Sequence, residues 1–106
     1  MDRALLLTAL RHREEILRTF LDDDGRLRSV PAKYSKRLVI LDHLAQLFEP
    51  GERCSESEVN RRLRAVHDDV AALRRYLVED GFLDRSGGFY WRMGGTVPDL
   101  DEPATG

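Results

Sequence analysis

Apolar residues recur three and four positions apart in three consecutive stretches of the chain, the spacing that turns one side of a helix towards a core. The pattern predicts helices over residues 35–49, 55–65 and 68–80, and Pro50 with Gly51 stops the first. We expect Leu41, Leu73 and Leu77 to lie in the shared core. The apolar positions are Leu38, Leu41, Leu44, Ala45 and Phe48, then Val59, Leu63 and Val66, then Val70, Leu73 and Leu77.

Residues at the ends of the last two predicted helices fit the known preferences for helix caps. Ser55 followed by Glu58 forms the capping-box pattern, in which each side chain accepts a hydrogen bond from the other's backbone amide. Asp68 is placed to cap the third helix, and Asp69 in its first turn suits the positive end of the helix dipole. Gly81 supplies a left-handed residue that ends this helix.

A hairpin is expected after Gly81. Ser86, Gly87 and Gly88 form a turn between strands over residues 82–85 and 89–92, since glycine tolerates the positive φ angles of tight turns. Residues 52–54 are placed to add a short strand beside this hairpin. Three helices and a hairpin predict a mainly α fold with a small β hairpin, in which a tri-helical core resembles a winged helix-turn-helix and an N-terminal helix is added.

One long amphipathic helix is predicted over residues 3–21. Its apolar face is wide, and it needs a partner, either the tri-helical core or the same helix of a second copy in a homodimer. The chain thus divides into an N-terminal amphipathic helix over 1–22, a winged-helix-like domain over 23–93 and a flexible acidic tail over 94–106. The apolar positions of the helix are Leu5, Leu6, Ala9, Leu10, Ile16, Leu17, Phe20 and Leu21.

Length and composition are those of one small domain. The 106 residues are 42% hydrophobic and 34% charged, and no run of 18 apolar residues could span a membrane, so we expect a cytoplasmic protein without membrane contact. Cys54 is expected to be a small buried residue. One cysteine and three scattered histidines lack the paired spacing of a zinc site, and we expect neither metal nor cofactor.

Positive charge is concentrated in one loop. Arginine and lysine alone carry the charge between residues 25 and 37, with no acid among them. This loop is either a solvated connector or a surface that contacts phosphates. Its basic residues are Arg26, Arg28, Lys33, Lys36 and Arg37.

Short motifs spread over residues 20–93 resemble a bacterial family, the domain-of-unknown-function family 2087. They are DGRL at 24–27, PAK at 31–33, EVN at 58–60, HDD at 67–69, LRR at 73–75 and YWR at 90–92. Cys54 departs from the family pattern, which tends to have an aromatic residue there. The resemblance implies a domain found alone or attached to helix-turn-helix regulators, and so a role in transcription regulation with no established activity.

Residue types used in acid-base chemistry are present, but a role in the fold explains the position of the acidic ones. Glu58, Asp68 and Asp69 complement helix ends, and neither a phosphate loop nor a nucleophile elbow accompanies His67 or Lys33. We therefore expect no enzymatic activity.

Binding to double-stranded DNA is the leading functional hypothesis, with residues 67–80 as the recognition helix and the hairpin as a wing. Two aspartates at the start of that helix would face a polyanion, which opposes this hypothesis. The alternatives are a protein-interaction module that dimerises or docks a regulator through its helices or wing, and a binder of small anions that uses the basic loop. The candidate DNA contacts are Lys33, Lys36, Arg37, Arg61, Arg62, Arg64 and Arg75, and those of the wing are Arg85, Tyr90 and Arg92. Of the two neighbouring wing aromatics, we assign Trp91 to the core.

Overall fold

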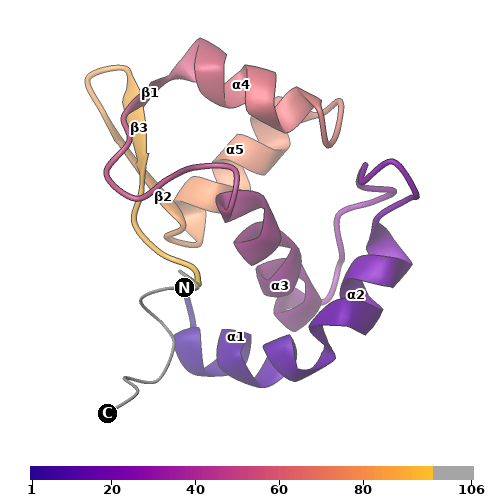
Figure 1. The fold of residues 1–106 in the computed structure, drawn as a ribbon. Coiled ribbons are helices and arrows are strands. Elements are labelled where there is room, and N and C mark those ends of the chain that lie inside the picture. Colours follow the sequence, from indigo (N-terminus) through magenta and orange to yellow (C-terminus); the bar gives the residue numbers. More distant parts are fainter. Residues whose placement is uncertain (97–106) are drawn as a thin grey trace.

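The computed structural model describes residues 1–96, which form a mainly helical domain with a small antiparallel sheet. Helix α3 runs through the middle of the domain, with α1 and α2 on one side and α4, α5 and the sheet on the other (Figure 1). The order of elements after residue 33 is compatible with a winged-helix layout. The elements are α1 (Arg3–Ala9), α2 (Arg13–Phe20), α3 (Tyr34–Ala45), β1 (Cys54–Ser55), α4 (Glu56–Arg64), α5 (Val70–Glu79), β2 (Leu83–Ser86) and β3 (Phe89–Arg92).

The N-terminal segment is two helices rather than the single helix predicted over 3–21. A 3-10 turn over Leu10–His12 separates α1 from α2, and the two helices lie at an angle to each other (Figure 1). The bend lets both halves of this segment, residues 3–20, which we call the arm, pack on α3. Leu6 is fully buried and Ile16 nearly so. Of the two partners predicted for this apolar face, the structure places it on the domain's own core.

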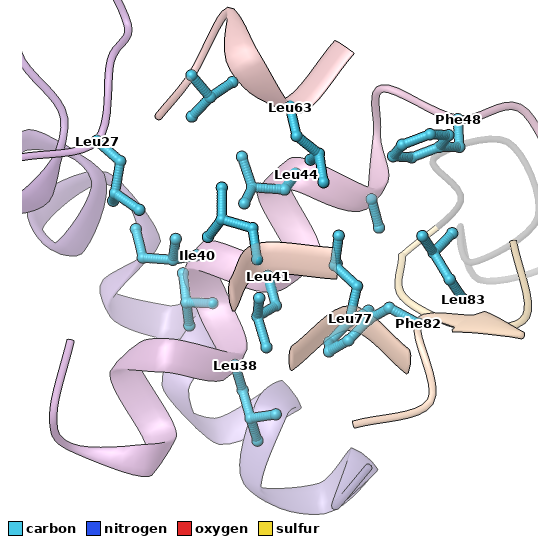
Figure 2. Packing of buried hydrophobic residues seen from close by; sticks show 14 of the residues in the cluster. Leu27, Leu38, Ile40, Leu41, Leu44, Phe48, Leu63, Leu77, Phe82 and Leu83 are labelled. Carbon is cyan, nitrogen blue, oxygen red and sulfur yellow. The ribbon is translucent and has the colours of Figure 1, made fainter. Parts of the chain in front are cut away.

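Helix α3 is the centre of the core. From Leu38 to Ala45 every residue except His43 is buried, so the helix has core contacts around most of its circumference. Leu41, Leu73 and Leu77 are fully buried, which confirms the predicted core positions. Figure 2 shows leucines of α3, α4 and α5 packed together with Phe82 beside them. The helix ends at Ala45, four residues before the predicted end, while Phe48 remains buried in the turn that follows.

Of the predicted caps, Gly81 is confirmed, one half of the Ser55–Glu58 capping box is present, and the cap of α5 is corrected. The Ser55 hydroxyl accepts a hydrogen bond from the Glu58 amide at 3.2 Å, and Gly81 adopts a left-handed φ of 78° after α5. The Glu58 carboxylate accepts hydrogen bonds from Arg61 and Arg62 instead of from the Ser55 amide. Asp69, not Asp68, caps α5 by accepting a hydrogen bond from the Ala72 amide at 3.1 Å. The helix therefore begins at Val70, two residues later than predicted.

The strands form one antiparallel sheet in the order β1-β3-β2. Ser86 belongs to β2 and pairs with Phe89, so the turn contains only Gly87 and Gly88, both with positive φ. The predicted strand over 52–54 is present over Cys54–Ser55, and Cys54 pairs with Tyr90. Cys54 is buried as predicted, and burial raises the pKa of its thiol. We call the β2–β3 hairpin the wing.

The last described residues pack on the core, although the sequence placed them in a flexible tail. Asp42 of α3 is only 1% exposed. Its carboxylate accepts hydrogen bonds from the amide of Thr96 at 2.6 Å and from the hydroxyl of Thr96 at 2.9 Å. Gln46 also donates to the Thr96 carbonyl oxygen at 2.8 Å. The remainder of the predicted tail, residues 97–106, lies outside the described residues.

Candidate nucleic-acid interface

Helix α5 turns one stripe inward and the opposite stripe to solvent. Val70, Leu73 and Leu77 are buried against the core. Ala71 and Arg75, on the other side of the helix, are exposed. Because Ala71 has a short side chain, the backbone of the first turn of α5 is open to a close approach from outside.

A groove of about 430 Å³ lies between this outer stripe and the wing. Its α5 wall contains Arg75 and Val78, and its wing wall contains Arg85 and Tyr90. The strand order explains how these residues meet, since β2 pairs Arg85 with Tyr90 on the side of the sheet that faces the helices. Arg74 and Glu79 also line the α5 wall, but Arg74 is mostly buried and pairs with Glu56 and Asn60. Arg75 and Arg85 are therefore the two exposed arginines of the groove, one on each wall.

Arg75 and Arg85 keep much of their surface exposed. The Arg75 side chain is 60% exposed, and its Nε lies 3.9 Å from Glu79 Oε1, a separation too long for a strong ion pair. Arg85 is exposed, and a hydrogen bond from its guanidinium to Tyr90 raises its pKa. These two side chains remain available to an anionic partner in the groove.

The acidic start of α5 is partly compensated by the basic loop. The guanidinium of Arg26 donates to Asp68 Oδ1 at 2.9 Å and to the carbonyl oxygen of Arg64 at 3.0 Å. The loop is held there by its backbone, since the Leu27 amide donates to the Val66 carbonyl oxygen at 2.8 Å. The Asp68 side chain is nevertheless 94% exposed, so the ion pair is a surface pair of small energy.

The arginines of α4 are mostly engaged by nearby acids. The Arg62 side chain is 21% exposed and lies within 3.0 Å of both Glu52 and Glu58, and it donates to the Leu47 carbonyl oxygen. The hydrogen bond from Arg62 lowers the pKa of Glu52 to about 2. Arg61 also pairs with Glu58, whose pKa is lowered by hydrogen bonds from both arginines. Arg62 therefore ties the end of α3 to α4.

Arg64 differs from its two neighbours on α4. Its side chain is exposed and has no ion pair within residues 1–96. Of the three candidates on this helix, it is the one whose charge is not balanced by a nearby acid.

The three candidates near the start of α3 do not gather at the α5 groove. Lys33 and Lys36 are exposed and line a separate groove beside the arm. The guanidinium carbon of Arg37 lies 5.2 Å from the ring centre of Tyr34 and 5.1 Å from that of Tyr76. Because Arg37 stacks on both rings and its Nε is buried, it links α3 to α5.

Two of the three wing candidates point inward. Tyr90 is 3% exposed, and its hydroxyl donates to Glu56 at 2.9 Å. Arg92 donates to the carbonyl oxygens of Phe48 and Thr96. These contacts give both residues a structural role, which leaves Arg85 as the wing candidate whose exposed charge faces the groove.

The assignment of Trp91 to the core is wrong, because alternation along β3 places Tyr90 there instead. Trp91 is partly exposed, and the guanidinium carbon of Arg53 lies 4.9 Å from the centre of its ring. Phe89 and Met93 follow the same alternation and are 46% and 61% exposed. The outer face of the wing therefore carries an exposed apolar row of Phe89, Trp91 and Met93.

Several residues of this surface were not identified from the sequence. Ala71 could have been found on the side of the helix away from Val70, Leu73 and Leu77, and Val78 at the edge of that buried stripe. The contact of Arg26 with Asp68 carries no signal in the sequence, since 42 positions separate the two residues.

The described residues contain no group of three or more histidine, cysteine or acidic side chains placed to hold a metal ion. No helix within residues 1–96 is long and apolar enough to cross a membrane.

A sequence model of a family described as uncharacterised proteins conserved in bacteria, DUF2087, matches residues 26–92. No curated protein and no solved structure was found to match the chain.

Proposed function

We propose that this chain, which belongs to the DUF2087 family of uncharacterised bacterial proteins, is a winged-helix protein that binds double-stranded DNA through α5 and the wing. The observation that carries the proposal is the groove between α5 and β2, with Arg75 on one wall and Arg85 on the other. A helix that enters the major groove while a hairpin contacts the adjacent backbone needs cations at both places.

The exposed stripe of α5 suits a position in the major groove. Ala71 presents a small apolar group, which can contact the methyl group of thymine, and Arg75 can reach a base edge or a phosphate. Arg85 on β2 is placed to contact a phosphate beside the groove. Asp68 opposes this placement, and Arg26 reduces its effect without removing it.

The number of phosphates that Arg75 and Arg85 neutralise sets the expected salt dependence. Each phosphate neutralised on duplex DNA contributes about −0.9 to the slope of log affinity against log salt. If Arg75 and Arg85 supply the phosphate contacts, the slope should be about −1.8, a roughly 12-fold loss of affinity between 50 and 200 mM salt.

Fluorescence anisotropy with labelled genomic duplexes tests the proposal over this salt range. Arg75→Ala and Arg85→Ala should each reduce the slope to about −0.9, or a roughly 3.5-fold loss over the same range. Arg18→Ala removes an exposed arginine from α2, far from the groove, and should leave the slope unchanged. Asp68→Asn should raise affinity for all sequences, because it removes one repulsive charge.

The proposal is wrong if the wild type shows no binding at 50 mM salt, or if the Arg75, Arg85 and Arg18 variants lose affinity equally. Circular dichroism of each variant shows whether a loss of binding reflects a loss of folded protein.

A second candidate function is association with another protein through the outer face of the wing. The observation that favours it is the exposed row of Phe89, Trp91 and Met93, since large apolar side chains grouped on one surface are typical of protein interfaces. Sedimentation would show self-association of the wild type, and a double Phe89→Ser, Met93→Ser variant should then be monomeric. DNA binding that survives in this variant would separate the two functions.

A further inference from the structure

A second groove lies on the other side of the domain, between the arm and the start of α3. Its volume of about 370 Å³ is near the lower end of the range for ligand pockets, about 300–1,000 Å³. It shares no lining residue with the groove between α5 and the wing. Any ligand held here would therefore leave Arg75 and Arg85 uncovered.

One part of this groove is apolar. Leu5 and Ala9 of α1 and Ile16 and Phe20 of α2 line it, because the bend at Leu10–His12 turns both helices of the arm towards α3. Leu5 and Phe20 are only partly buried, so they offer apolar surface that the core does not cover. A ligand with an apolar body can remove this surface from water.

Another part of the groove is basic. Lys33 and Lys36 line it, and neither has an ion pair within the described part of the chain. They are one helical turn apart, so one anionic group can lie near both ammonium groups. Glu15 and His12 line the groove from the arm. The negative charge of Glu15 offsets the positive charge of one lysine. The groove therefore suits an anion with a single negative charge better than a phosphate with two.

From these contacts we infer that the groove binds a small amphipathic carboxylate, with its apolar chain along the arm and its carboxylate between Lys33 and Lys36. The combination of an apolar wall and a few convergent polar groups is typical of small-molecule sites. The inference is independent of DNA binding and can be tested without DNA.

Titration of the full chain with octanoate, followed by ¹H–¹⁵N NMR, tests the inference. Octanoate should bind saturably and shift the amide signals of groove residues such as Thr8, Thr19 and Ser35. Two charged contacts at an exposed site should make octanoate bind about three- to tenfold more tightly than 1-octanol. Each methylene added between hexanoate and octanoate should raise affinity by up to about fourfold.

A double Lys33→Gln, Lys36→Gln variant is the decisive comparison. Both side chains are exposed, so the variant should fold, and it should bind octanoate and 1-octanol about equally. Arg18→Gln removes an exposed cation from α2 outside the groove and should keep the wild-type preference. The inference is overturned if 1-octanol binds the wild type as tightly as octanoate, if octyl phosphate binds more tightly, or if the lysine variant behaves like Arg18→Gln. Shifts confined to the wing, or no saturable binding, would also overturn it.

Discussion

Replacing Thr96 by valine should destabilise the domain, because its hydroxyl donates a hydrogen bond to a carboxylate inside the core. The hydroxyl of Thr96 donates to Asp42 at 2.9 Å, and Asp42 is 1% exposed. Valine has nearly the same shape as threonine but cannot donate. The substitution therefore removes a partner of a buried polar group and leaves the packing almost unchanged.

The expected loss follows from the kind of hydrogen bond removed. A hydrogen bond to a charged group contributes about 1.5–3 kcal/mol to the free energy of unfolding. The lower half of that range applies, since Thr96 is only partly buried and its amide still donates to Asp42. A loss of about 1.5–2 kcal/mol in a domain of this size lowers the melting temperature by roughly 6–8 °C.

Thermal unfolding followed by circular dichroism measures this shift, with Thr96→Ser as the matched control. Serine keeps the hydroxyl and loses one methyl group, so Thr96→Ser should lose less than about 1 kcal/mol. Equal melting temperatures for the valine and serine variants would refute the reasoning, since the hydroxyl would then contribute nothing. A double-mutant cycle with Asp42→Asn would show whether the valine effect passes through Asp42.

Two further predictions concern the core and the ion pairs of α4. Leu73→Ala should cost about 2–5 kcal/mol in urea unfolding, because the side chain is fully buried, and a loss under 1 kcal/mol would contradict its place in the core. The depressed pKa of Glu52 stabilises the fold above its unfolded pKa near 4.5, and this contribution disappears as the pH falls towards 2. Glu52→Gln should therefore reduce the loss of stability between pH 5 and 2, because a glutamine side chain does not titrate, and an unchanged loss would contradict the prediction.

Local patterns in the sequence predicted much of the fold. Ser55 and Gly81 act within a few residues of their own positions, and the leucine spacing of α5 follows from helix geometry alone, so these features could be predicted. The break at Leu10–His12 could not, because it depends on the curvature needed to follow α3. Neighbouring residues of a strand point to opposite faces, so either Tyr90 or Trp91 could point to the core. The pairing of β3 with β1, which places Tyr90 opposite the buried Cys54, determines which one does.

The candidate site was harder to predict than the fold. Sequence treated Arg61, Arg62 and Arg64 alike. The pairs of Glu58 with Arg61 and Arg62 follow helical spacing and could have been predicted. The approach of Glu52 to Arg62 could not, because it depends on the fold. Arg75 and Arg85 were both chosen as candidates, but their position across one groove depends on how the wing packs beside α5. Pairings between distant residues set the charge available at the surface, and such pairings have no local signature.

The burial of α3 has a consequence for how the domain unfolds. The arm covers one side of its buried segment, and the remaining helices cover the opposite side. The two sides therefore share one core. Loss of either cover would expose apolar surface of the same helix, which couples the two halves in one cooperative unit. The amide protons of α3 should then exchange with solvent only through global unfolding, and those of the arm should follow closely. Although the family match begins at residue 26, the smallest cooperative unit therefore includes the arm.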